Sequence, residues 1–498
     1  MSNAATSARP DDVSPVRRGQ RVVIIGGGPA GYEAALVAAQ LGAQVWLVED
    51  RGLGGSAVLT DVVPSKTLVA AAESLAGSLA DGQEPRQEHA PEMAALNARV
   101  RRLASEQSHD LTVRMAQKGI EVIHGRARLG SLDAIGTRTV HVRPAPGPWL
   151  GAGEQCTGAP VGCDVPQDLA ADIILVATGA RPRRLSSAEP DGRRILTWTQ
   201  LYDLDGLPEH LIVVGSGVTG AEFAGAYLAL GSRVTLVSSR ERVLPTVDAD
   251  AAELVEGRFR ARGMRVLSGA RAVAARVIAD DGAPADESVE VELADGRVVV
   301  GSHCLMAVGA VPATAELGLA EAGVELTDSG HIKVDRVSRT TAYRVYAAGD
   351  CTGVLPLASV AAMQGRIAMR HALGDAVSPL EVGTVAQAVF TMPEIASIGI
   401  GEAEVKAYDA VSTTVPLARN PRAKMAGVSE GFVKLFSQRR SGEVLGGVIV
   451  GRAASEQVLA VTLAVTHRLT VEQVMNAFSV YPSLSGTITE AARQLHVR

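Results

Sequence analysis

The stretch RVVIIGGGPAGYEAALVAAQLGAQVWLVED, residues 21–50, decides the fold because its pattern occurs twice in the chain. The second copy, HLIVVGSGVTGAEFAGAYLALGSRVTLVSS at residues 210–239, aligns without a gap at one offset (215 − 26 = 189). Each copy predicts a buried β-branched strand, an alanine-rich helix and a second strand, which together form a βαβ unit. Two such units predict two dinucleotide-binding domains.

Each copy carries the spacing G-x-G-x-x-G between its first strand and its helix. The first glycine allows the tight turn, the second lets the backbone approach a pyrophosphate, and the third lets the helix pack on the strand. The N-terminus of the helix then faces the phosphates. The glycines expected to bind cofactor are Gly26, Gly28 and Gly31 in the first copy and Gly215, Gly217 and Gly220 in the second.

The two copies differ at the end of the second strand, where the ribose of a dinucleotide is recognised. The first copy has Glu49, whose carboxylate can bind ribose hydroxyls and suits the adenosine of FAD. The second copy has Ser238, followed by Ser239 and Arg240. Without an acid there, a 2′-phosphate is not repelled, and a guanidinium can pair with it. We therefore expect FAD at the first site and NAD(P)H, with NADPH favoured, at the second, unless Arg240 is merely solvated.

Composition excludes several other classes of function. The 498 residues carry a formal net charge of −6 and only 3% aromatic residues, so neither a basic nor a base-stacking surface for nucleic acid is expected. No apolar stretch reaches the roughly 18 residues that span a bilayer, and no residue spacing suggests a metal site. Cys304 and Cys351 lie in apolar contexts and are expected to be buried thiols. Cys156 and Cys163 share a glycine-rich stretch and are expected to be two surface thiols, with a pairing between them as the alternative. A cytoplasmic protein is the expectation.

Further motifs follow in a specific order. They are ILVATGARP at 174–182, TAYRVYAAGDCTG at 341–353, LPLASVAAMQGRIAM at 355–369 and GGVIVGRAASE at 446–456. Together with the two fingerprints and the PSK at 64–66, they resemble the flavoprotein pyridine nucleotide–disulfide oxidoreductases, which include dihydrolipoamide dehydrogenase and glutathione reductase. The resemblance runs from about residue 21 to residue 492. It implies FAD, a pyridine nucleotide and a homodimer.

The resemblance also implies roles for individual residues. Thr178 and Gly179 would lie in the turn that closes the first FAD segment. Asp350 matches the aspartate that binds the ribityl chain of the flavin, and Ala358 lies in the segment that resembles the helix beneath the isoalloxazine ring.

This chain departs from the family pattern at its reactive site. The family signature is close to G-G-T-C-L-N-V-G-C-I-P-S-K, and here residues 54–66 place Ala57 and Val62 where the two cysteines would stand. The second family motif, H-P-T-x-S-E, becomes YPSLSG, so that Tyr481 replaces the histidine base and Gly486 the glutamate. Thiol–disulfide exchange needs two thiols, and a tyrosine with a pKa of about 10 is a poor base at neutral pH. Dithiol chemistry is therefore not expected.

The hydride-transfer half of the machinery is retained. Lys66 stands where the family places a lysine near flavin N5, and Glu222 stands where the family places its ion-pair partner. We therefore expect an FAD-dependent NAD(P)H:quinone oxidoreductase that passes hydride through flavin to a small-molecule quinone or dye. Tyr481, contributed by the partner subunit, would be the third catalytic residue. Two alternatives stay open: a soluble pyridine nucleotide transhydrogenase, and a catalytically silent scaffold that binds FAD.

The expected fold class is α/β, with two Rossmann-type dinucleotide-binding domains and a C-terminal α+β dimerisation domain. The expected boundaries are a disordered tail at 1–20, a first FAD segment at 21–198, an NAD(P)H domain at 199–305, a second FAD segment at 306–380 and an interface domain at 381–498.

Overall fold

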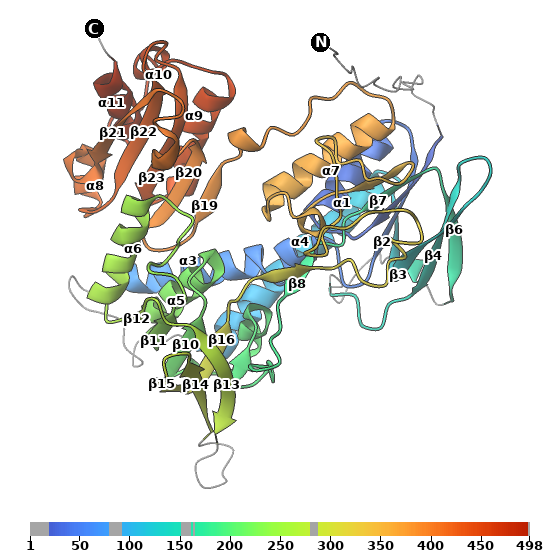
Figure 1. The fold of residues 1–498 in the computed structure, drawn as a ribbon, viewed down its shortest axis with the longest axis horizontal. Coiled ribbons are helices and arrows are strands. Elements are labelled where there is room, and N and C mark those ends of the chain that lie inside the picture. The colour runs from blue at the N-terminus through green and yellow to red at the C-terminus, as the bar shows by residue number, and fades with distance from the viewer. Residues whose placement is uncertain (1–18, 79–91, 151–160, 163–164, 279–286, 497–498) are drawn as a thin grey trace, which may run out of the picture. The chain divides into compact units, whose positions relative to one another are not determined.

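The computed structural model (Figure 1) describes residues 19–78, 92–150, 161–162, 165–278 and 287–496. All but the last two residues of the expected tail at 1–20, as well as Cys156 and Cys163, lie outside these ranges. The chain divides into two compact units. The first comprises Met1–Leu59, Ser105–Arg181 and Pro312–Leu380, and the second comprises Thr60–Ala104, Pro182–Val311 and Glu381–Arg498.

The first unit is built around one eight-stranded sheet in the order β18-β7-β1-β2-β3-β4-β6, with β5 paired to β3. The strands from β18 to β3 run parallel, whereas β4 pairs antiparallel with both β3 and β6. Their bounds are β1 Arg21–Ile25, β2 Gln44–Glu49, β3 Glu121–Leu132, β4 Arg138–Pro144, β5 Val161–Gly162, β6 Gln167–Ala171, β7 Ile173–Val176 and β18 Val345–Ala347. The central parallel strands β1, β7 and β18 are almost fully buried, as expected for strands covered on both faces.

Two helices of this unit, α1 (Pro29–Gln40) and α7 (Ala358–Ala372), lie side by side in Figure 1. Gly365 makes the close packing possible, because a Cβ at this position would lie 2.1 Å from the carbonyl oxygen of Ala30. An ion pair of 3.1 Å joins Arg366 of α7 to Glu33 of α1. The unit also contains α2 (Gly55–Leu59) and a short 3-10 helix at Asp350–Thr352.

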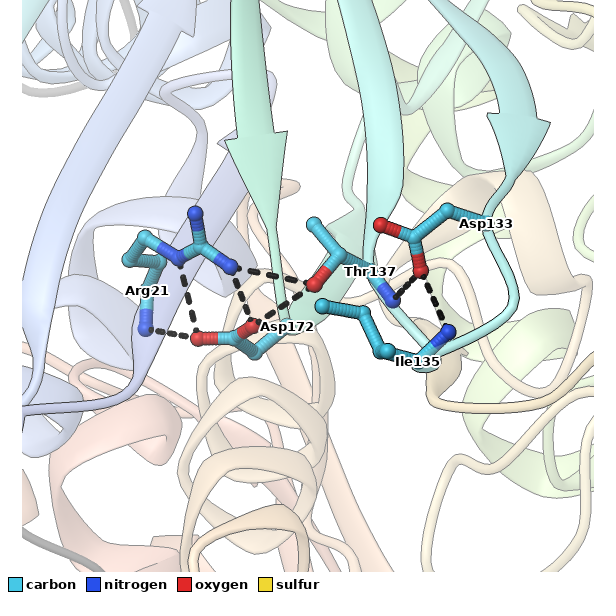
Figure 2. A network of polar contacts seen from close by, with 5 residues as sticks. All are labelled: Arg21, Asp133, Ile135, Thr137 and Asp172. Atoms are coloured by element: carbon cyan, nitrogen blue, oxygen red, sulfur yellow. Dashed lines mark hydrogen bonds and ion pairs between the residues drawn. The ribbon is translucent and has the colours of Figure 1, made fainter.

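A polar network fixes the start of β1 (Figure 2). The guanidinium of Arg21 donates to both carboxylate oxygens of Asp172 and to Thr137 Oγ1, and the backbone N–H of Arg21 also donates to Asp172. The hydrogen bond from the Arg21 side chain lowers the pKa of the Asp172 carboxyl. In the neighbouring turn, Asp133 accepts from the backbone N–H groups of Ile135 and Thr137. Segments far apart in sequence are thereby tied to the edge of the first βαβ unit.

The second unit contains a five-stranded parallel sheet in the order β12-β11-β10-β16-β9 and an antiparallel sheet in the order β13-β14-β15. The strand bounds are β9 Ile195–Leu196, β10 His210–Val214, β11 Arg233–Val237, β12 Arg265–Leu267, β13 Ala272–Ile278, β14 Ser288–Leu293, β15 Val298–Gly301 and β16 His303–Met306. The helices are α3 Val62–Ser78, α5 Val218–Leu230 and α6 Ala249–Ala261, with a 3-10 helix at Trp198–Asp203. The long helix α4 spans Met93–Gln117, and the short strands β8 and β17 span Ala180–Pro182 and Ala310–Pro312.

The C-terminal part of the second unit is an antiparallel sheet in the order β19-β20-β23-β22-β21. Its strands are β19 Gln387–Val389, β20 Glu394–Gly399, β21 Ala410–Pro416, β22 Phe432–Gln438 and β23 Val444–Gly451. Its helices are α8 Pro421–Met425, α9 Ala454–Thr466, α10 Val471–Met475 and α11 Gly486–Leu495, and short 3-10 helices occur at Val382–Thr384, Glu402–Glu404 and Leu417–Arg419. Helices α9 and α11 pack on this sheet and share its apolar core.

The observed elements confirm the expected α/β class, with two dinucleotide-type sheets whose βαβ strands run parallel and a C-terminal α+β part. The finer boundaries at 198, 305 and 380 remain predictions. Within the described ranges, no helix combines the length and the apolarity that a bilayer crossing would require.

Candidate functional site

The first glycine loop has the geometry that its sequence predicted. Gly26 adopts a φ of 105°, and a Cβ there would lie 2.3 Å from the carbonyl oxygen of Ala177. A Cβ at Gly31 would lie 1.8 Å from the carbonyl oxygen of Gly26, so only glycine allows α1 to start against β1. Gly28, which precedes the first residue of α1, has open space where a Cβ would point. That opening lets a pyrophosphate approach the backbone.

The second loop repeats this geometry residue by residue. Gly215 has a φ of 112°, and its Cβ would lie 2.2 Å from the carbonyl oxygen of Ala307. A Cβ at Gly220 would lie 1.8 Å from the Gly215 carbonyl oxygen, and Gly217 faces open space. Gly28 and Gly217 are the N-cap residues and have no side chain that could cap these helices, so the free N–H groups in the first turns of α1 and α5 remain available to an anion.

Glu49 ends β2, and its side chain is 8% exposed. One carboxylate oxygen accepts from the N–H of Gly27 at 2.6 Å, and the other accepts from the N–H groups of Asp50 and Arg51. Burial raises the pKa of this carboxyl, and the bond from Gly27 opposes the rise. The carboxylate is therefore held against the glycine loop, as a ribose-binding acid must be.

Ser238 takes the place of Glu49 in the second copy. Its hydroxyl lies 2.7 Å from the hydroxyl of Ser216, which is the residue aligned with Gly27. It also donates to the carbonyl of Arg240 and accepts from the N–H of that residue, which shapes the turn. Ser239 and the side chain of Arg240 are exposed, and no carboxylate of the described residues pairs with this guanidinium.

Thr178 and Gly179 lie in the turn after β7. The Thr178 hydroxyl donates to the carbonyl of Ala313, and the Gly179 carbonyl accepts from the N–H of the same residue. Gly179 has a φ of 68°, which favours glycine there. These hydrogen bonds stabilise the turn, so both residues have a structural role in addition to the expected contact with cofactor.

Asp350 begins a 3-10 helix. The hydrogen-bond partners of its carboxylate indicate whether this unit suits a flavin. No donor of the described residues hydrogen-bonds this partly buried carboxylate, and burial raises its pKa. The preceding Gly349 is held by the Gln364 side chain at 2.8 Å. Ala358, the first residue of α7, is exposed, and no side chain caps this helix end. A partly buried acceptor without a donor among the described residues and an uncapped helix N-terminus fit a ligand rich in hydroxyl and carbonyl groups.

Lys66 and Glu222 are brought together as predicted. The Lys66 ammonium on α3 lies 2.7 Å from Glu222 Oε2 on α5, and the glutamate side chain is only 4% exposed. The other oxygen of Glu222 accepts from the N–H of Phe390 at 2.8 Å. The Phe390 ring lies beneath the ammonium, 4.9 Å from Nζ to the ring centroid. The lysine is thus held by an ion pair and a cation–π contact, in a site from which water is partly excluded.

The positions that depart from the family signature carry no sulfur. Ala57 lies in α2 and Val62 begins α3. Cys304 and Cys351 are free and buried, and burial raises their thiol pKa values to about 12 and about 11, as expected for inert structural thiols. Tyr481 is 82% exposed on the C-terminal part. No cluster of His, Cys, Asp and Glu among the described residues could hold a metal ion.

Sequence reasoning missed two members of these sites. Phe390 is 168 residues from Glu222, and no local pattern marks its backbone N–H as a partner of a buried glutamate. Ser216 could have been found, because it aligns with Gly27, just as Ser238 aligns with Glu49.

Comparisons with known proteins agree with this geometry. The family described as pyridine nucleotide-disulphide oxidoreductase matches residues 20–365, and its dimerisation domain matches residues 385–492. The chain belongs to the pyridine nucleotide-disulphide oxidoreductase family. Membership implies FAD and a pyridine nucleotide as cofactors, and the predicted resemblance is confirmed.

Two groups of relatives are informative within this oxidoreductase family. A Mycobacterium tuberculosis protein named NAD(P)H dehydrogenase (quinone) is 48% identical, with 95% of this chain and 94% of the relative covered. A dihydrolipoyl dehydrogenase of Chlorobaculum parvum is 33% identical, with 95% and 96% covered. The crystal structure of LpdA from Mycobacterium tuberculosis superposes with a TM-score of 0.86 at 47% identity, covering 96% of this chain and all of that one. The HOCl-induced flavoprotein disulfide reductase RclA from Escherichia coli, at 23% identity and a TM-score of 0.78, shares the fold.

Proposed function

We propose that the protein is an FAD-dependent NAD(P)H:quinone oxidoreductase that favours NADPH and works without a redox disulfide. The observation that carries the proposal is the intact Lys66–Glu222 pair in a chain whose two signature cysteine positions hold Ala57 and Val62. A relative 48% identical over nearly its whole length is named NAD(P)H dehydrogenase (quinone), which supports the same conclusion.

Different residues of the chain are proposed to bind different parts of the two cofactors. Bound FAD supplies a two-electron carrier between the pyridine nucleotide and the acceptor. The open backbone at Gly28 binds one pyrophosphate and that at Gly217 binds the other, since neither position has a protein atom in the way. Glu49 orients a ribose. The carboxylate of Asp350, which no donor of the described residues reaches, accepts a hydrogen bond from a hydroxyl of the flavin cofactor.

Lys66 provides a fixed positive charge. Its partner Glu222 is anchored by the N–H of Phe390, so the ammonium cannot swing away without leaving a buried carboxylate unpaired. A preorganised cation stabilises negative charge that develops during electron transfer without reorganising at that moment. Tyr481, exposed on the C-terminal part, is proposed to reach the acceptor side of the partner subunit.

Steady-state turnover of the purified holoenzyme tests the proposal. We expect rapid oxidation of NADPH, and slower oxidation of NADH, with a menadione-like quinone, and negligible consumption of lipoamide or glutathione disulfide. Rapid transfer to thio-NAD with no quinone reduction would instead establish the transhydrogenase. If NADPH fails to bleach the flavin on the stopped-flow timescale, the protein is a scaffold and the proposal is wrong.

Arg240→Gln is expected to lower the preference for NADPH over NADH by about 10-fold, because a charge-assisted bond to the 2′-phosphate is lost. The side chain is exposed and carries no described ion pair, so the change should leave stability within about 0.5 kcal/mol. The ratio of kcat/KM for the two coenzymes measures the effect. Arg233→Gln, at the opposite end of β11, is the control and should leave that ratio unchanged.

Homodimerisation is proposed from the exposed apolar side chains of the C-terminal part. Phe478 is fully exposed, Val480 and Tyr481 are 78% and 82% exposed, and Leu459 and Leu463 of α9 are also exposed. Side chains of this kind gathered on one part of a protein mark an interaction surface, and the match to the family's dimerisation domain supports a second copy as the occupant.

Phe478→Asp is therefore expected to weaken the dimer by about 100-fold, because an aromatic anchor is replaced by a charge. Sedimentation velocity across a concentration series measures the shift. Ile135→Asp changes a side chain that is 87% exposed on the first unit, and it should leave the dimer intact. Equal dissociation in both variants would contradict the proposed interface.

A further inference from the structure

Lys434 is a buried cation outside the site described above. It lies on β22, its side chain is 5% exposed, and its ammonium is 2.9 Å from Asp248 Oδ2 and 2.6 Å from Asp250 Oδ2. Burial alone would lower the pKa of Lys434, but the hydrogen bonds to Asp250 and Asp248 outweigh that effect and raise it. Lysine is almost never buried to this degree unless it is paired.

Both carboxylates belong to the N-terminus of α6, in the part of the unit that carries the second glycine loop. Asp248 is the N-cap of that helix and accepts from the N–H of Ala251 at 3.2 Å, while Asp250 lies in its first turn. The Asp248 side chain is 4% exposed, so it depends on Lys434 and on its capping bond for compensation. The start of α6 is thus fixed by a residue of the C-terminal sheet.

The segment that runs from β11 to α6, residues 238–247, is here called the coenzyme loop. It contains Ser239 and Arg240, the residues proposed to receive the 2′-phosphate of NADPH. Its start is anchored by Ser238, whose N–H donates to Leu267 and whose carbonyl accepts from Ala270. The backbone of Arg240 is held as well, since its N–H donates to Ser238 Oγ and its carbonyl accepts from the N–H of Gly269 at 2.8 Å. The exposed side chains of Ser239 and Arg240 make no described hydrogen bond, so their direction depends on the path of the loop that follows.

The far end of the coenzyme loop is packed into the protein, because the side chains of Val243 and Leu244 are buried. The N–H of Leu244 donates to the carbonyl of Ser216, and the N–H of Val243 donates to Glu256 Oε2 at 3.0 Å. Leu244 adopts a φ of 52°, a conformation that a leucine keeps only where its surroundings impose it. The loop then ends directly at Asp248, which Lys434 holds.

We propose that Lys434 is a positioning residue for coenzyme selection: through Asp248 it holds the end of the coenzyme loop so that Ser239 and Arg240 meet the 2′-phosphate of NADPH. The proposal rests on the proposed function only for the assignment of this loop to NADPH. It gives the C-terminal sheet a part in choosing the coenzyme, in addition to its part in the proposed dimer.

A second ion pair between α6 and the C-terminal part provides the matched control. Arg258 lies 3.3 Å from Glu430, but both side chains are nearly half exposed, and the arginine is on the last turn of α6, away from the coenzyme loop. If attachment of α6 were all that mattered, removing either pair would have the same kind of effect. If Lys434 positions the loop, only its removal changes coenzyme selection.

The test measures binding of NADP⁺ and NAD⁺ to the holoenzyme by calorimetry, which needs no quinone turnover. Lys434→Met is expected to lower the preference for NADP⁺ by about 10-fold, because a misplaced guanidinium loses its bond to the phosphate. The double variant Lys434→Met/Asp248→Asn removes the unpaired buried carboxylate but keeps a good N-cap residue. It should recover most of the lost Tm while the preference for NADP⁺ stays low, and Arg258→Gln should leave the preference unchanged.

Three results would overturn the proposal. One is a wild-type protein that shows no preference for NADP⁺. Another is a Lys434→Met protein whose affinities for the two coenzymes fall equally or not at all. The third is a double variant that recovers the preference together with its Tm, since the lysine would then act through stability alone. Absence of quinone reduction would overturn the proposed function but not this assignment, because the binding ratio is measured without an acceptor.

Discussion

Lys66→Met should lower turnover of NADPH with a quinone by about 100-fold, the loss that follows removal of one preorganised charge stabiliser. The ammonium is held at a fixed point by Glu222 and by the ring of Phe390, and methionine fills a similar volume without the charge. The loss should appear in kcat, while KM for NADPH stays within a few-fold, because the nucleotide is proposed to bind at the second glycine loop. Initial rates at saturating quinone measure this split.

Stability has to be separated from catalysis in that experiment. Glu222 is almost fully buried, so removing its partner leaves an unpaired carboxylate and is expected to cost about 2 kcal/mol, less than for a fully buried pair because Lys66 is 27% exposed. The double variant Lys66→Met/Glu222→Gln keeps an acceptor for the N–H of Phe390 and should regain the lost Tm without regaining turnover. Recovery of turnover in the double variant would show that the pair is structural. The exposed Lys118 provides a control, since Lys118→Met should change neither property.

The glycine loops could be predicted from the sequence because the constraints on them are local. Gly26 and Gly215 have a positive φ, and a nearby carbonyl oxygen leaves no room for a Cβ at either position. Both constraints arise because a strand turns directly into a helix. The repeat at a fixed offset made the prediction stronger than either loop alone. The pairing of Lys66 with Glu222 was predicted in a different way, since it followed from the family resemblance and not from a pattern in the residues themselves.

Contacts between distant segments could not be predicted in the same way. The N–H of Phe390 and the ammonium of Lys434 reach carboxylates 168 and 186 residues away, and no local pattern marks either residue as the partner of a distant carboxylate. Such contacts depend on how sheets and helices pack, which one sequence does not specify. The assignment of Thr60–Ala104 to the second unit could not be predicted either. Ala57 and Lys66 belong to one signature in the sequence, yet they fall in different units.

Gly217→Ala should raise KM for NADPH by one to two orders of magnitude and leave the fold intact. The backbone there has a φ of −70°, which alanine adopts readily, and no protein atom lies within 4 Å of where its Cβ would point. The free space is needed by the pyrophosphate, and overfilling it by one methyl group costs about 1–3 kcal/mol of binding. Steady-state kinetics and a thermal melt of the same preparation measure the two properties.

Gly215→Ala is the contrasting variant, because its Cβ would lie 2.2 Å from the carbonyl oxygen of Ala307 at a φ of 112°. It should lose stability as well as NADPH binding, whereas Gly217→Ala should lose binding alone. The FAD content of both proteins should stay at the wild-type level where they fold, since the flavin is assigned to the first glycine loop. Normal KM in the Gly217→Ala protein would mean that no dinucleotide pyrophosphate approaches this backbone, and the second site would then need a different ligand.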